Sequence, residues 1–277
     1  MTTHSSTLQA SGRGQATSAD RRRQVVVTVS EVLCVVGTLV GVGVLGTRVE
    51  ESSGGSLAAD ATLLAPAVPA FSIWSVIYLG LGAYTVWQWL PGPATDPRVR
   101  STGYLAAVSM LLNAAWLLVT QQGWIWVSVG VIAALTITLG VLVRRLGSSA
   151  GATTASRLLL DGTFGLYLGW VSVATCANVT AALVSSGVRP GAAVAQGAAV
   201  VVLAVAAGVG VLLARQLGGR YAVAAAMAWG LGWIAVGRVT TGPTSLVTAV
   251  AAGVAAAVVL WAATAERPTG RARPATA

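Results

Sequence analysis

Two apolar segments of the chain carry aromatic and polar side chains in a pattern that a lipid-facing helix does not need. Residues three, four and seven positions apart lie on one face of a helix, so each set forms a single stripe. The stripes consist of Phe71, Trp74 and Tyr78, and of Tyr167, Trp170, Ala174 and Asn178. Two such stripes facing each other would line a site for noncovalent binding.

A third apolar segment carries Asn113 and Trp116 at a spacing of three. Asn113 and Asn178 both lie inside apolar runs, where an amide needs a hydrogen-bond partner. Two interpretations stay open for each amide: a hydrogen bond between helices, or a contact with a ligand.

The chain shows no constellation of nucleophile, base and acid, and we therefore predict no catalytic residues and no enzyme. His4 is the only histidine and lies in a polar tail, so no metal site is predicted. Cys34 and Cys176 lie inside apolar runs and are interpreted as small buried hydrophobic residues. No cofactor is predicted.

The composition is that of an integral membrane protein. Of the 277 residues, 55% are hydrophobic and 9% are charged, against roughly 25% charged in a soluble domain. The net charge of +9 comes from 17 basic residues, all of them arginine, which lie almost entirely between apolar runs. This distribution indicates membrane topology, and nucleic acid is not an expected partner.

A bilayer core about 30 Å thick requires roughly 20 apolar residues per helix. We therefore predict an all-α integral membrane protein with about eight transmembrane helices, embedded in the lipid bilayer. The predicted spans are 25–47, 70–90, 102–120, 124–143, 159–185, 193–214, 221–238 and 244–263. Residues 1–24 are expected to form a disordered cytoplasmic tail, and residues 264–277 a second tail.

The arginines divide unequally between the two sides that eight spans define. One side receives 14 of the 17, and the other receives Arg48, Arg189 and Arg238. By the positive-inside rule, the arginine-rich side and both termini are cytoplasmic. The expected location is the plasma membrane.

Charged and small residues within the spans suggest how the helices pack. Glu31 and Asp161 are expected near the cytoplasmic helix ends, paired with arginines or reaching the interface. Glycines four residues apart in the first and fifth spans allow close helix contact. Packing within the chain is the simpler explanation and dimerisation the alternative, so a homodimer remains a possible partner arrangement. The loop 48–69, before Phe71, is interpreted as either a lid or a passive linker.

The order of these motifs resembles the TspO/MBR family of tryptophan-rich sensory or translocator proteins. Phe71-x-x-Trp74-x-x-x-Tyr78, Asn113-x-x-Trp116 and Tyr167-x-x-Trp170-x-x-x-Ala174-Thr175-x-x-Asn178 occur in the family's order. The resemblance covers about residues 25–186 and implies a five-helix bundle, with residues 187–263 adding three helices.

Two positions depart from the family pattern, both in the region that shapes its ligand pocket. Pro69 stands where members typically carry Trp, and Leu166 stands where they carry Pro.

The resemblance implies a membrane sensor or translocator that binds a flat hydrophobic ligand, a porphyrin or other tetrapyrrole, or a sterol-like molecule. Aromatic faces suit such ligands, and a few polar groups orient them. The expected wall residues are Phe71, Trp74, Tyr78, Trp116, Tyr167 and Trp170, and the expected hydrogen-bonding residues are Asn113, Thr175 and Asn178. The alternatives are a secondary transporter of a small apolar substrate and a membrane enzyme that modifies a bound tetrapyrrole.

Overall fold

The computed structural model describes residues 15–41, 53–147, 152–218 and 220–266. Within these ranges, eight helices are long and apolar enough to cross a membrane, as the sequence predicts. They are α1 (Ser18–Gly41), α2 (Ile73–Trp87, entered through the 3₁₀ turn Val68–Ser72), α4 (Pro97–Gln121), α5 (Ile125–Arg145), α7 (Thr163–Ser185), α8 (Ala192–Leu217), α9 (Tyr221–Thr240) and α10 (Leu246–Ala265). Short helices α3 (Pro91–Thr95) and α6 (Thr154–Ser156) precede α4 and α7.

The helix boundaries agree with the predicted spans to within about five residues, except at the start of the first one. The helix α1 begins at Ser18, so residues 18–24 are helical and the prediction of a disordered tail is wrong for them. Their helical start is stabilised by Asp20, whose carboxylate accepts a hydrogen bond from the Thr17 backbone N–H at 3.0 Å. Residues 1–14, 42–52 and 267–277 of the predicted tails and loop lie outside the described residues.

Local sequence signals set several helix ends. Asp96 caps α4 by accepting a hydrogen bond from the Arg98 backbone N–H at 2.7 Å, and Pro97 occupies the first helical position, where no N–H is needed. Ser245 caps α10 through the Thr248 N–H at 3.2 Å. The helix α8 ends at Gly218, whose φ of 69° is left-handed and suits glycine.

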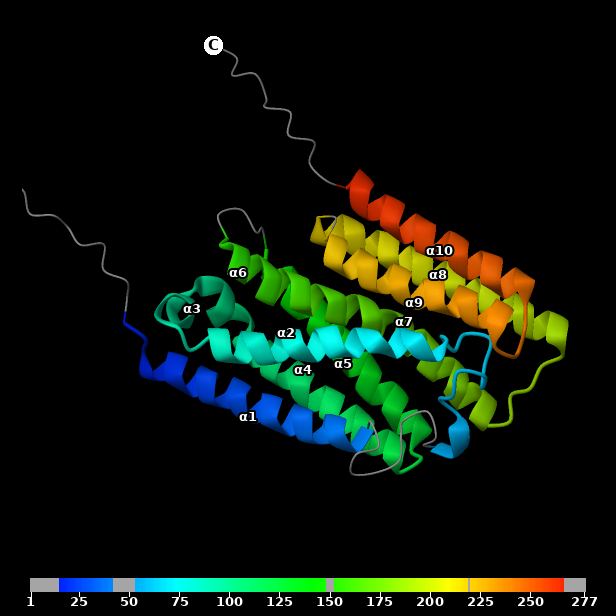
Figure 1. Ribbon diagram of the computed structural model, residues 1–277, viewed down its shortest axis with the longest axis horizontal. Helices are drawn as coiled ribbons and strands as arrows, with labels where there is room; N and C mark the ends of the chain where they lie inside the picture. The colour runs from blue at the N-terminus through cyan, green and yellow to red at the C-terminus, as the bar shows by residue number, and fades with distance from the viewer. Residues whose placement is uncertain (1–14, 42–52, 148–151, 219, 267–277) are drawn as a thin grey trace, which may run out of the picture.

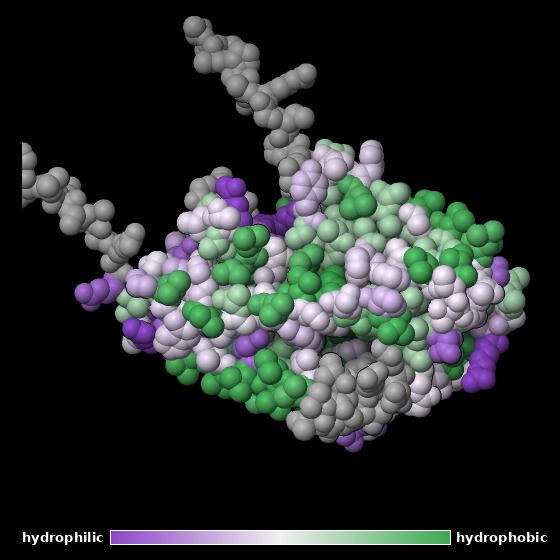
Figure 2. Space-filling model, viewed as in Figure 1, coloured by the Kyte–Doolittle hydropathy of each residue, from purple (hydrophilic) through white to green (hydrophobic). Residues whose placement is uncertain are grey.

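The helices pack side by side along a common direction (Figure 1). Successive neighbours are α1, α4, α5, α7, α9, α10 and α8, while α2 lies against α1 and α7. The first residue of α1 and the last of α10 lie toward the same end of the bundle (Figure 1). Figure 2 shows hydrophobic side chains spread over the helix faces and strongly hydrophilic ones gathered mainly near the two ends. This arrangement fits helices whose apolar faces contact lipid.

The predicted glycine pairs make helix contacts within the chain. Gly37 lies against Ala114 of α4, where an added Cβ would come within 3.0 Å of the Ala114 Cα. Gly169 lies against α9, where an added Cβ would come within 2.9 Å of Ala226 Cβ. The second pair therefore joins the first five spans to the last three.

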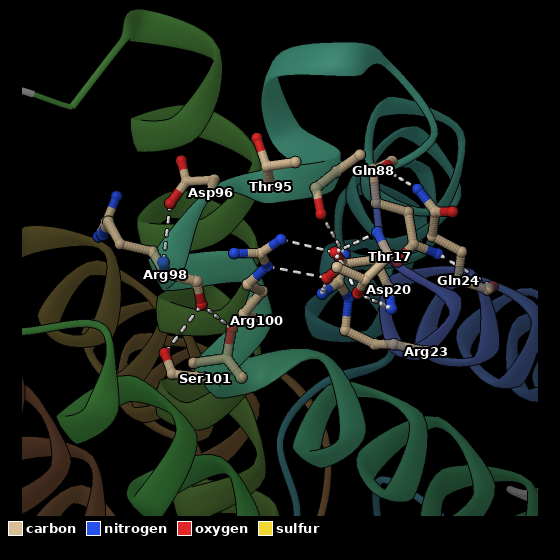
Figure 3. Close-up of polar contacts among 12 residues, drawn as sticks. Thr17, Asp20, Arg23, Gln24, Gln88, Thr95, Asp96, Arg98, Arg100 and Ser101 are labelled. Carbon is tan, nitrogen blue, oxygen red and sulfur yellow. Dashed lines mark hydrogen bonds and ion pairs between the residues drawn. The ribbon is translucent and has the colours of Figure 1, made fainter. Parts of the chain in front are cut away.

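Ion pairs gather at the arginine-rich end of the bundle, where Figure 3 shows one of the networks. The Asp20 carboxylate accepts hydrogen bonds from Arg23 at 2.7 Å and from Arg100 at 2.6 Å, which joins α1 to α4. Asp161 lies in a π-helical turn, Arg157–Gly162, and contacts Arg98 at 2.7 Å and also Arg220. The expected pairing of Asp161 with arginines is confirmed.

Glu31 differs from the expectation. Its side chain is buried and makes no ion pair with the described residues, and its Oε2 has no hydrogen-bond partner among them. Gly82 of α2 lies beside it, because an added Cβ there would be 3.9 Å from Glu31 Oε1. The side chain therefore turns into the interface between α1 and α2 instead of reaching the arginines.

Candidate functional site

The two aromatic stripes face each other across the contact between α2 and α7. The Trp74 ring stacks on Tyr78 with ring centroids 5.1 Å apart, and its edge contacts Tyr167 at 5.7 Å and Trp170 at 6.2 Å. Phe71 contacts Trp170 edge-on at 5.8 Å. The helical spacing put each stripe on one face, and the packing of α2 on α7 brings the two faces into direct contact.

Asn113 and Trp116 of α4 close the third side of this aromatic cluster. The Asn113 Nδ2 donates a hydrogen bond to the Tyr78 hydroxyl at 2.9 Å. The Trp116 Nε1 donates to Asn178 Oδ1 of α7 at 2.8 Å. Both amides that the sequence left open thus join helices by hydrogen bonds.

Ser128 of α5 is a member of the cluster that the sequence did not indicate. The Asn178 Nδ2 donates to its hydroxyl at 3.0 Å, and both residues are buried. Serine is common in this chain and Ser128 follows a turn, so neither its type nor its spacing distinguished it. Asn178 therefore links three helices, α4, α5 and α7.

Two of the predicted residues make hydrogen bonds besides the ring contacts described above. Thr175 points to α5, where its hydroxyl lies 2.9 Å from the hydroxyl of Thr136, and it also bonds the Val171 carbonyl. Tyr167 is fully buried and donates to the Ser109 carbonyl at 3.3 Å. Thr175 contributes to the packing of α7 on α5. Tyr167 contributes its ring to the cluster through Trp74 and joins α7 to α4 by its hydrogen bond.

Two small cavities border the aromatic cluster. One, of about 30 Å³, is lined by rings and by both Asn113 and Trp170. The other, of about 50 Å³, lies between Phe71, Trp116 and Trp170 and the segment 56–66 of the first long loop. Ala174, which belongs to the second stripe, lines both cavities. The described part of the loop thus covers the cluster, a position that both the lid and the linker interpretation allow.

Two buried polar atoms, in residues that line the smaller cavity, have no hydrogen-bond partner among the described residues. They are Trp170 Nε1, a donor, and Asn113 Oδ1, an acceptor. Both side chains are at most 2% exposed. A buried polar group without a partner costs roughly 1–3 kcal/mol, so the two atoms mark a place where a bound molecule would gain from complementary groups.

The covering loop is held by α9. The Arg238 side chain is fully buried, and its guanidinium donates to the backbone carbonyls of Thr62 at 2.7 Å, Ala59 at 2.9 Å and Ala65 at 3.3 Å. Trp229 Nε1 donates to the Ala70 carbonyl at 2.9 Å.

The sequence interpretation counted Arg238 only as one of three arginines on the less basic side. Its position in the last turn of an apolar helix, on the side with few arginines, was the available sequence signal, because a guanidinium that becomes buried there needs acceptors.

The chemistry of the cluster is apolar and hydrogen-bonding. Its side chains are aromatic rings, aliphatic groups, amides and hydroxyls, and no carboxylate or guanidinium is found among the described residues that line the cavities. Among the described residues, no three His, Cys, Asp or Glu side chains come together in a way that would hold a metal ion. The arrangement suits binding of a molecule with large apolar faces.

Fold and site together define a multi-pass α-helical membrane protein with an aromatic cluster between the helices α2, α4 and α7. A family model described as TSPO-like protein matches residues 25–264, and the chain belongs to this family. The match runs through α8, α9 and α10, so the likeness is not confined to the first five spans. Neither the curated proteins nor the solved structures gave a match.

Proposed function

We propose that this protein is a membrane sensor or translocator that binds a flat hydrophobic ligand, a tetrapyrrole or a sterol-like molecule, in the aromatic cluster. One observation carries the proposal: Trp170 and Asn113, whose Nε1 and Oδ1 atoms have no hydrogen-bond partner among the described residues, both line one cavity whose other walls are aromatic and aliphatic side chains. A ligand with apolar faces would pack against the rings, and its polar edge would supply hydrogen-bond partners for Trp170 Nε1 and Asn113 Oδ1. The function is binding, with no catalytic step assigned to the protein.

Binding would require the site to open. The cavities of about 30 and 50 Å³ are far smaller than the roughly 300–1,000 Å³ of pockets that hold drug-sized ligands. Phe71, Trp74 and Trp116 are only partly buried, so their rings can turn away at lower cost than the fully buried Tyr167. Ligand binding would therefore replace ring–ring contacts with ring–ligand contacts of similar kind.

The surroundings of the site are part of the proposal. The protein would reside in the plasma membrane with both termini in the cytoplasm, because 14 of its 17 arginines fall on that side of the eight spans. Its partners would be the hydrophobic ligand, the lipid bilayer and a second copy of the chain. The family membership supports ligand binding as the general role.

The proposal is tested by titrating the full-length, detergent-solubilised protein with protoporphyrin IX and following the shift of the porphyrin Soret absorption band. Trp170→Phe keeps a ring and removes the Nε1 donor, so we expect the dissociation constant to rise about fivefold to tenfold. Trp74→Ala removes the central ring and should weaken binding more. Competition by cholesterol would show whether sterols use the same site.

Trp261→Phe is the matched control, because Trp261 of α10 is 68% exposed and remote from the cluster in the packing order of the helices. It should bind protoporphyrin IX as the unmodified protein does. Equal dissociation constants for Trp170→Phe, Trp74→Ala and Trp261→Phe would contradict the assigned site.

A further inference from the structure

A larger cavity lies outside the aromatic cluster, at the loop end of the bundle. Its volume is about 390 Å³, within the range of small-molecule pockets. We call it the α7–α8 groove. Its walls come from the end of α7, the start of α8 and the loop, and include Leu63, Leu183, Val188, Ala195, Ala199 and Val202.

The groove exists because α8 packs mainly on α10 and has few contacts with α7. The connection between them, which includes Val188 and Pro190, spans the space that the two helices leave at this end. The loop residue Thr62 lines both this groove and the larger cavity of the aromatic cluster. The loop segment therefore forms the wall between two separate sites.

The groove combines an apolar interior with positive charge at its rim. Arg189 lines it, is exposed, and makes no ion pair or hydrogen bond with any described residue. Gln196 of α8 also lines it, and its amide has no hydrogen-bond partner in the described part of the chain.

A second guanidinium lies behind the groove wall. Arg238 donates to the carbonyls of Thr62 and Pro243, both of which line the groove, and it forms no salt bridge within the described ranges. No carboxylate of the described residues lines the groove. Asp60, beside the lining residue Ala61, is exposed, so solvent screens its opposing charge.

We infer that the α7–α8 groove binds an anionic phospholipid of the adjacent leaflet. One acyl chain lies along the apolar wall formed by α7, α8 and the loop. The phosphate of the headgroup accepts hydrogen bonds from Arg189, and Gln196 donates to the phosphate or the glycerol esters. Guanidinium groups suit phosphate because they present paired N–H donors. This site is independent of the ligand proposed for the aromatic cluster.

The test uses the full-length protein in detergent, incubated with palmitoyl-oleoyl phosphatidylglycerol or with its phosphatidylcholine counterpart, and native mass spectrometry to count retained lipids. The unmodified protein should retain the anionic lipid in preference to the zwitterionic one. Arg189→Gln should reduce phosphatidylglycerol retention about fivefold, because one arginine near a membrane surface contributes attraction of that size. Arg189→Lys should restore part of it.

Two matched controls separate recognition from general effects. Arg215→Gln removes an exposed arginine at the other end of α8 and should leave retention unchanged. Ala195→Phe fills the groove and should abolish retention of the lipid, whereas Ala193→Phe, on an exposed position of the same turn outside the groove lining, should not.

Three results would overturn the inference. Equal retention of the two lipids by the unmodified protein would show that the groove does not recognise the anionic headgroup. Equal losses in Arg189→Gln and Arg215→Gln would show only a general effect of charge. Equal retention in Ala195→Phe and Ala193→Phe would place the lipid elsewhere.

Discussion

Asn178 illustrates how a single polar residue in an apolar helix finds its partners. Its amide accepts from Trp116 of α4 and donates to Ser128 of α5. Lipid offers no alternative partner, so these hydrogen bonds favour one rotation of α7 against its neighbours. At the residue scale, the amide fixes the geometry of the cluster and also borders the cavity beneath the loop.

We predict an energetic coupling between Trp116 and Asn178. In a double-mutant cycle with Trp116→Phe and Asn178→Leu, the free energies of unfolding should show a coupling of about 0.6 kcal/mol, the average for hydrogen bonds between transmembrane helices, and at most about 1.7 kcal/mol. Unfolding in mixed micelles measures it. The Trp126–Ser186 pair, at 2.8 Å but exposed, is the comparison and should couple more weakly. Additive effects of the first pair would contradict the prediction.

At the scale of elements, α9 has two tasks. One face holds Gly165 and Gly169 of α7 in close contact, and its last turn places Arg238 among the loop carbonyls. A buried guanidinium needs several acceptors, and backbone carbonyls at the turns of the loop supply them. The helix α9 therefore holds the loop that covers the aromatic cluster in position.

Replacing Arg238 should release this loop. In Arg238→Met, the carbonyls of Ala59, Thr62 and Ala65 lose a charged donor, and we expect the free energy of unfolding to fall by about 2–4 kcal/mol. Loop opening is measured by the rate of maleimide labelling of Ala58→Cys, which should rise in the Arg238→Met background.

Arg189→Met is the matched control for Arg238→Met. It removes an arginine at the same end that makes no hydrogen bond or ion pair with the described loop residues, so the labelling rate should stay the same. A labelling rate unaffected by Arg238→Met would show that the loop is held by other contacts.

At the scale of the whole molecule, the number of helices and the positions of the ion pairs single out the same end of the bundle. The first and last described helices have their outer ends at the same end of the bundle (Figure 1), as an even number of spans requires. The ion pairs of Asp20 and Asp161 lie at that end and join helices that are distant in sequence. Arginines there bind the helices of the bundle together through ion pairs.

The proposed orientation makes opposite predictions for the two ends. Gln216 lies at the arginine-rich end of α8, and Thr241 follows α9 at the loop end; both side chains are exposed. The test replaces each residue with cysteine in a separate variant, Gln216→Cys and Thr241→Cys. A membrane-impermeant maleimide applied to intact cells should label Thr241→Cys, and should label Gln216→Cys only after permeabilisation. The reverse pattern would contradict cytoplasmic termini.

The sequence by itself determined the number of spans, nearly all of their boundaries, and the faces that carry the aromatic stripes. These follow from local rules: a span needs enough apolar residues to cross the bilayer, and the helical period assigns side chains to faces. The family motifs also selected residues that the structure brings together, Trp74 with Tyr167 and Trp116 with Asn178 among them.

Only the tertiary structure decided how the faces meet. Thr175 turns to α5, Ser128 joins Asn178, Glu31 is buried away from the arginines, and Arg238 holds the loop. In a membrane protein both the lipid-facing and the buried surfaces of a helix are apolar, so the sequence pattern does not state which face is inside. The rotation and tilt of each helix come from packing and hydrogen bonds with neighbours distant in sequence, and these contacts gave the aromatic cluster its walls, cavities and cover.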